Sequence, residues 1–123
     1  MATPLEQHEQ FIRDRLEDPR SRKAEALQWL EASEGKNTLG ELGSTQDSIE
    51  LVGAIYAAGA EAVIAIEIDE YDGHENTGKL IIKVPTVKAL RKRLFAWHGK
   101  HAESMGFDAE QDMGQSHLFA MLD

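Results

Sequence analysis

The chain of 123 residues contains no cysteine, which excludes disulfide bonds and thiolate metal sites and makes the fold independent of redox state. It has no run of about 18 apolar residues, so the sequence predicts no transmembrane helix and no membrane partner. Residues 1–11 have neither the basic start nor the apolar core of a signal peptide, and we expect a cytoplasmic protein.

Common catalytic motifs are also missing. The sequence lacks the Gly-x-Ser-x-Gly elbow of hydrolases and the His-Glu-x-x-His helix of zinc proteases. Acidic residues and histidines are plentiful, but the sequence does not show which of them converge in space. We therefore predict no catalytic, cofactor-binding or metal-binding residue and no cofactor, and favour a protein that is not an enzyme.

Charge of one sign is absent from long stretches of the chain. Residues 37–78 hold nine acids and no lysine or arginine, residues 79–101 hold seven lysines and arginines and no acid, and residues 102–123 hold five acids and no base. The net charge of −9 argues against general affinity for nucleic acid. Because unlike charges attract, the blocks predict complementary surfaces within one domain or between copies of the chain.

What the chain does have is enough apolar sequence for one domain with a core, since 41% of its residues are hydrophobic. Residues 59–85 predict two antiparallel strands joined by a polar loop over residues 69–78 that contains Gly73 and Gly78. Glu67 is placed to pair with Lys79 or Lys83 across the strands. The side chains predicted to lie beneath the helices are Ile64, Ile66, Ile68, Leu80, Ile82 and Val84. Those predicted to form an open face are Val63, Ala65, Glu67, Ile81 and Lys83.

Two helices are predicted before this hairpin. Thr3, Pro4 and Glu6 form a helix start with a capping box, and Pro19 ends the helix. A second helix is predicted over residues 20–33, with Gly35 as its stop. We expect residues 1–36 to form an antiparallel helical pair packed on the same domain.

The remaining elements complete an α+β fold. We predict a short strand over residues 37–42, a helix over residues 46–58 capped by Ser44 or Thr45, a helix over residues 86–101 and a last strand over residues 116–123. The core positions of the two helices are predicted as Ile49, Val52, Ile55, Tyr56, Val87, Leu90, Leu94 and Trp97. Residues 37–123 thus resemble the βαββαβ order of a ferredoxin-like domain, an antiparallel sheet with two helices on one face.

Two acidic segments contain cation-ligand types but lack the spacing of an EF-hand loop. The first comprises Asp69, Glu70, Asp72, His74 and Glu75, and we expect it to be a solvated hairpin tip. The second comprises Asp108, Glu110 and Asp112, and it lacks the sixth-position glycine and the terminal glutamate.

His98 and His101 are spaced to share one helix face, but two histidines are fewer ligands than zinc normally takes. The helical projection places His101 in the middle of the apolar arc and His98 at its edge. We expect both to be structural histidines.

Two anion-binding patterns are weak. Gly40 and Gly43 precede a helix N-terminus, but no lysine accompanies them, and Glu41 and Asp47 would repel a phosphate. The basic segment 88–93, followed by aromatic residues, could contact RNA, yet the predicted open sheet face carries no aromatic side chain for base stacking. Nucleic acid is therefore not the partner that we expect.

These features favour a non-catalytic protein-interaction module that associates with itself as a homo-oligomer. The alternative is a small-ligand-binding sensor or enzyme of ferredoxin-like architecture, with a pocket between subunits.

Overall fold

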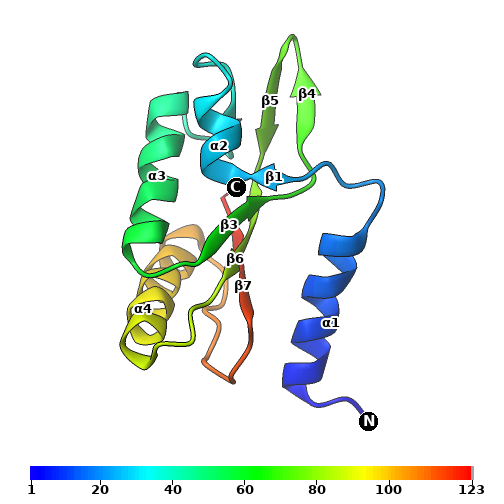
Figure 1. The fold of residues 1–123 in the computed structure, drawn as a ribbon, viewed down its shortest axis with the longest axis vertical. Helices are drawn as coiled ribbons and strands as arrows, with labels where there is room; N and C mark the ends of the chain where they lie inside the picture. The colour runs from blue at the N-terminus through cyan, green and yellow to red at the C-terminus, as the bar shows by residue number, and fades with distance from the viewer. Residues whose placement is uncertain (123) are drawn as a thin grey trace.

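The computed structural model describes residues 1–122 as an α+β protein, with sheets between helices (Figure 1). In chain order the elements are α1 (Pro4–Glu17), β1 (Ala24–Glu25), α2 (Ala26–Glu31), β2 (Thr38–Leu39), α3 (Thr45–Ala57), β3 (Ala62–Ala65), β4 (Asp69–Tyr71), β5 (His74–Thr77), β6 (Lys79–Lys83), α4 (Lys88–Met105) and β7 (His117–Met121). None of the helices in this part of the chain is long and apolar enough to cross a membrane.

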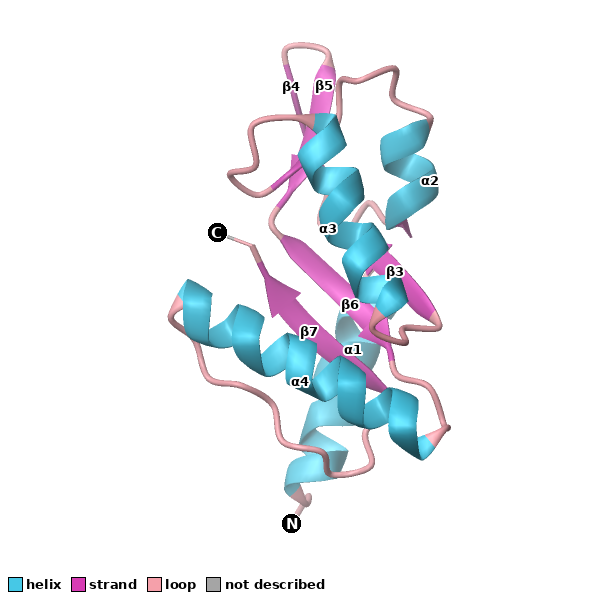
Figure 2. Ribbon diagram, turned by 90° about the vertical axis from the view of Figure 1, so that its left-hand side faces the viewer, coloured by secondary structure: helices cyan, strands magenta, loops and turns pink. Residues whose placement is uncertain are grey.

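Two sheets share the chain. Sheet A has the order β1-β3-β6-β7 and is antiparallel throughout, whereas sheet B has the order β2-β5-β4. Helices α3 and α4 cover one face of sheet A, and α1 covers the other (Figures 1 and 2). The predicted first strand, β2, pairs in parallel with β5 in sheet B and lies outside sheet A, so the ferredoxin-like order is not confirmed.

The predicted hairpin pairs as expected, but the facing assigned to its first strand is wrong. Val63 lies opposite Ile82 and Ala65 opposite Leu80, and all four pack in the main core beneath the helices. Ile64 and Ile66 face the other way, toward α1. Both faces of the sheet are covered by apolar residues, so alternation along the strand could not identify the face that meets α3 and α4.

Glu67 explains why Ile68 nevertheless reaches the main core. Its φ of +52° places a left-handed residue between Ile66 and Ile68, and this kink reverses the alternation. Ile66 is fully buried in the cluster beneath α1, while Ile68 is buried in the main core. For Ile68, Leu80, Ile82 and Val84 the predicted burial beneath the helices is confirmed.

The face predicted to be open is covered by α1. Ile12 is buried against Ile66 and Ile81, with other apolar residues of α1 and β7 around them. The rings of Phe11 and Phe119 meet edge-on, with centroids 5.2 Å apart. The sheet therefore buries both of its faces.

Helix α1 begins and ends where predicted. Thr3 Oγ1 accepts a hydrogen bond from the Glu6 amide, and the Thr3 amide donates to the Glu6 carboxylate, both at 3.1 Å. This reciprocal capping box also lowers the pKa of Glu6, mainly through the Thr3 amide. Asp18 is the C-cap, directly before Pro19.

The second helix is shorter than predicted and does not neighbour α1. Ala24 and Glu25 pair with β3 as strand β1, so α2 starts only at Ala26. The Glu25 carboxylate caps it by accepting from the Gln28 amide at 2.7 Å. Because α2 packs against α3, it lies across sheet A from α1, and the expected helical pair does not form.

The polar segment predicted as a loop is itself a hairpin. Strands β4 and β5 are joined by Asp72 and Gly73, which have φ values of +46° and +83°. Positive φ at both central residues is the type I′ turn, for which Asp-Gly is a strong sequence signal that the loop prediction missed.

The predicted α3 and β7 are confirmed, although Asp123 lies outside the described residues. Ser44 caps α3 by accepting from the Asp47 amide at 3.0 Å. Helix α4 begins later than predicted and extends to Met105, and Val87, placed on its core face by the pattern, is an exposed N-cap residue.

Candidate functional site

Helix α4 closes the free edge of sheet A. The Leu122 amide donates to the Gly78 carbonyl, and the Val84 amide donates to the Ser116 carbonyl. The even-numbered residues of β7 therefore form backbone hydrogen bonds with β6, and the backbone groups of the odd-numbered residues point to the free edge. The atoms that meet this edge are side-chain atoms: Nε2 of His98 lies 2.8 Å from the Phe119 carbonyl oxygen, Nε2 of His101 lies 2.8 Å from the Met121 carbonyl oxygen, and Glu110 accepts from the Phe119 amide at 2.8 Å.

Glu110 joins three segments of the chain. One carboxylate oxygen contacts Nε2 of His8 in α1, and the other lies 3.8 Å from Nε2 of His98 in α4. The side chains of His8 and Glu110 are 15% and 17% exposed, and His98 is fully buried. Gln115 also donates to Glu110 at 3.3 Å. This His-Glu cluster places three titratable side chains where α1, α4 and β7 meet.

A second polar contact holds α1 to β7. The Glu9 carboxylate accepts from the Ser116 amide at 3.2 Å and from Ser116 Oγ at 2.8 Å. Ser116 Oγ also lies 2.8 Å from Nδ1 of His117. Glu9, Ser116 and His117 border a recess of about 230 Å³ beside α1.

The protonation of this contact follows from its surroundings. Burial, the largest single influence, would raise the pKa of Glu9, but the two hydrogen bonds from Ser116 together with the nearby His8 and His117 outweigh it, and the pKa is lowered. Burial lowers the pKa of His117. The ionised Glu9 carboxylate already accepts the hydrogen bond of the Ser116 amide, so this amide is not free to stabilise an oxyanion. The arrangement is therefore better suited to holding α1 against the sheet than to nucleophilic catalysis.

A polar cleft of about 520 Å³ lies between the α1–β1 linker and the β3–β4 kink. Its three cations each pair with a carboxylate: Arg20 with Asp18, Arg22 with Glu75, and Lys79 with Glu67. The predicted pair between Glu67 and Lys79 is thus confirmed, at 3.1 Å. Because each cation is already paired with a carboxylate, the cleft has no net positive charge with which to attract an anion.

The first acidic segment is divided between two environments. Glu75 accepts from Trp29 Nε1 at 2.9 Å and pairs with Arg22, and these contacts lower its pKa, the Trp29 bond first. Asp69, Glu70 and Asp72 stay exposed on β4 and its turn.

The second acidic segment does not converge either. Glu110 binds His8, and Asp112 pairs with Arg91 at 2.6 Å, which lowers the pKa of Asp112. Within residues 1–122 no group of three or more histidine, aspartate or glutamate side chains is arranged to hold a metal ion.

The burial of the two α4 histidines is the reverse of the prediction from the helical projection, which placed His101 in the middle of the apolar arc and His98 at its edge. His98 is fully buried, whereas His101 is partly exposed and stacks on Trp97 with ring centroids 5.1 Å apart. The reason is that α4 turns Leu94, His98 and Ala102 toward the sheet. Both rings bond to backbone carbonyls, as structural histidines do.

The glycine-rich segment before α3 lines a recess of about 650 Å³. Lys36, a few residues before Gly40, also lines this recess, and the fold brings His74 to it from the distant β4–β5 hairpin. The acidic side chain of Asp72 lines the recess as well, so the recess is not purely basic.

The basic block separates into two groups. Lys79, Lys83 and Arg91 pair with Glu67, Glu61 and Asp112. In the described chain the other four cations, all exposed on α4, have no carboxylate within 4.0 Å: Lys88, Lys92, Arg93 and Lys100.

Sequence reasoning missed the pairing of His8 and Glu9 with Glu110 and Ser116, because these contacts join residues about one hundred positions apart. No local motif marks either contact, and only the packing of α1 across the sheet brings them together. Comparison of the chain with protein-family models, with curated proteins and with solved structures finds no match.

Proposed function

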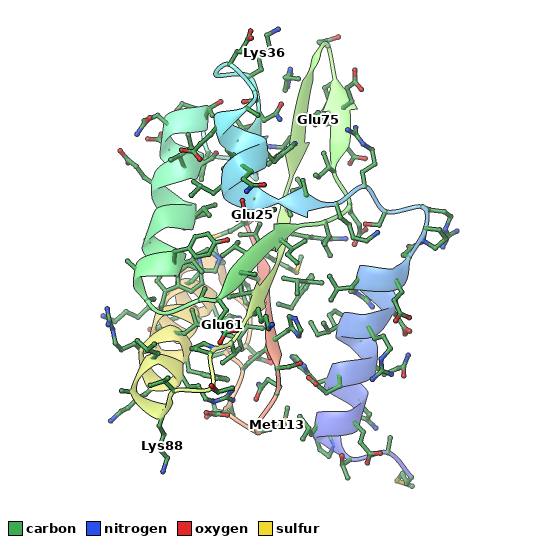
Figure 3. The ribbon with its side chains drawn as sticks, viewed as in Figure 1. Glu25, Lys36, Glu61, Glu75, Lys88 and Met113 are labelled. Atoms are coloured by element: carbon green, nitrogen blue, oxygen red, sulfur yellow. The ribbon has the colours of Figure 1, made fainter. Side chains whose placement is uncertain are left out.

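We propose that the protein is a non-catalytic interaction module that associates with itself through the surface formed by α3 and α4. The observation that carries the proposal is the group of four α4 cations without a carboxylate partner. Lys88, at the start of α4, extends away from the body of the molecule (Figure 3). Unlike charge on a second copy would neutralise this group.

The chain carries suitable acids on the neighbouring helix. Glu41, Asp47 and Glu50 surround the N-terminal half of α3, and all three are exposed. The outer side of the same helix continues with Ala54 and Ala57, small residues that let another helix approach closely.

The placement of the two helices suits a two-fold dimer. Helices α3 and α4 lie on the same face of sheet A (Figure 2). A two-fold axis that passes between the two helices sets α4 of each copy against α3 of the other, so that the basic and acidic groups meet twice. The sheet face that the sequence predicts to be open is covered by α1 and does not offer a surface for association.

Sedimentation velocity over a range of salt concentrations tests the proposal. We expect a dimer at low salt that dissociates as salt screens the charges. Lys92→Glu should weaken the dimer by roughly tenfold or more, because it sets like charges against each other. Arg20→Glu, the same charge change on the α1–β1 linker, is the matched control and should leave the dimer intact.

A charge exchange adds a positive test. Mixing Lys92→Glu protein with Glu50→Lys protein should restore association, since each defect then meets an opposite charge. A wild-type protein that remains monomeric at low salt and high concentration would refute the proposal.

A further inference from the structure

Strand β4 is the outer strand of sheet B, and its hairpin projects from the body of the protein (Figures 1 and 2). All three of its residues, Asp69, Glu70 and Tyr71, are exposed, and Tyr71 is 57% exposed. An exposed sheet edge presents backbone donors and acceptors to any extended segment that approaches it.

The hydrogen-bond directions identify which residue of β4 faces outward. Glu70 lies opposite Glu75 in the register, and the Glu75 amide donates to Asn37 Oδ1 at 3.0 Å, on the side away from β4. Opposite residues of an antiparallel pair either bond to each other or both point away. The Glu70 amide and carbonyl therefore point to the free edge.

The chain itself places an extended segment at the start of this edge. The Ile68 amide donates to the Arg22 carbonyl at 3.1 Å, and the Glu67 amide donates to Ser21 Oγ at 3.0 Å. Beyond this point, within residues 1–122, no strand pairs with the outer side of β4. The α1–β1 linker thus pairs with the chain just before β4, and an added strand would extend this pairing along β4 past Glu70.

Charge selects the chemistry of the segment that fits. Asp69, Glu70 and Asp72 form no ion pair with any cation of the described chain. A second copy pairing β4 with β4 would set these acids against one another, which is unfavourable. Lysine or arginine side chains would instead meet Asp69 on one face of the strand and Glu70 on the other, with Tyr71 available for a cation–π contact.

We propose that the free edge of β4 binds an extended, lysine- or arginine-rich segment of a partner protein by strand addition. This surface is separate from the α3–α4 face proposed for self-association, and neither proposal rests on the other.

The probe is a fluorescein-labelled octapeptide of alternating lysine and threonine, followed by fluorescence anisotropy with wild-type protein. We expect binding that weakens as salt rises. The same peptide N-methylated at its four central residues keeps its charge but loses backbone donors, and it should bind about tenfold more weakly or worse.

Variants of the protein locate the contact. Glu70→Pro removes the outward amide, and Glu70→Lys reverses the charge, so each should reduce binding by about tenfold. Glu31→Lys, the same charge reversal at an exposed position of α2, should bind normally. Lys92→Glu should also bind normally, which separates this site from self-association.

Absence of binding to wild-type protein would overturn the proposal. Equal binding of the plain and N-methylated peptides would also overturn it, because charge attraction alone would then suffice. The methylated peptide is tested on unaltered protein, so this outcome does not depend on whether Glu70→Pro folds.

Discussion

His98 and Phe119 form the contact by which a helix closes the edge of sheet A: Nε2 of the buried histidine lies 2.8 Å from the phenylalanine carbonyl oxygen. Edge strands with free backbone groups invite pairing with other chains. Here Glu110 and His101 engage the neighbouring backbone groups of β7 as well. Strand β7 is therefore protected, whereas β4 is not.

Replacing His98 with leucine keeps the volume but leaves the Phe119 carbonyl buried without its partner. We expect a loss of about 1–3 kcal/mol in the free energy of unfolding, measured by urea denaturation. His101→Leu is the comparison, and it should cost less because water can reach the Met121 carbonyl beside a partly exposed ring. Equal losses at both positions would contradict the assignment of His98 as the edge-closing residue.

The α1-covered face makes Ile66 a core residue, although not on the side that the alternation predicts. Ile66→Ala should cost about 2–5 kcal/mol, as should Ile82→Ala in the main core. Only the former should selectively speed hydrogen exchange of the α1 amides, because Ile66 packs on Ile12. Ile64→Ala, at a partly exposed position on the same face, should cost less. Equal protection of α1 in the Ile66 and Ile82 variants would contradict this packing.

Replacing glycine with alanine should change the stability in opposite directions in the β4–β5 turn and in helix α3. Gly73→Ala places a side chain at φ +83° and should destabilise the protein by about 1 kcal/mol. Gly53→Ala in α3 adds a methyl group that meets no atom within 4 Å apart from its chain neighbours and its own helix backbone, and it should stabilise the protein by about 0.5–1 kcal/mol. Thermal unfolding of the two variants measures both effects. Stabilisation by Gly73→Ala would mean that the type I′ turn is wrong.

The stability that the contact between Glu9 of α1 and Ser116 contributes should depend on pH. The folded pKa of Glu9 lies below its ordinary value of 4.5, so the folded state binds fewer protons than the unfolded chain in acid. Its contribution is complete above about pH 4.5 and is lost as the pH falls through the folded pKa. Ser116→Ala should lower the melting temperature near neutral pH, and this difference from wild type should shrink below pH 4.5. A difference that stays constant with pH would show that Ser116 does not act through Glu9.

We also predict that His98 and His101 bind no metal. In each ring Nε2 already lies at hydrogen-bond distance from a carbonyl oxygen of β7. A chelator should therefore leave the melting temperature unchanged. A chelator-induced decrease that is absent from the His98→Ala and His101→Ala variants would reverse this assignment.

The sequence was sufficient to predict the features that depend on contacts between residues close together in the chain. The capping box of Thr3 and Glu6 and the cap at Ser44 were readable because each bond spans three residues. The pairing of β3 with β6 and the bond between Glu67 and Lys79 followed from matched alternation on the two sides of one polar segment. The Asp-Gly turn of β4 and β5 was readable in the same way, although the loop prediction passed over it.

Long-range packing alone set the remaining features. Which face of β3 meets α3 and α4 depends on where α1 lies, since both faces are apolar, and Ala24 and Glu25 are a strand only because β3 lies beside them. The contact of Glu9 with Ser116 joins residues 107 positions apart. Hydrophobic patterns specify that a side chain is buried, but they are non-directional and do not name the partner that buries it. The partners of Glu9, His8 and His98 therefore emerge only when the helices settle on the two faces of the sheet.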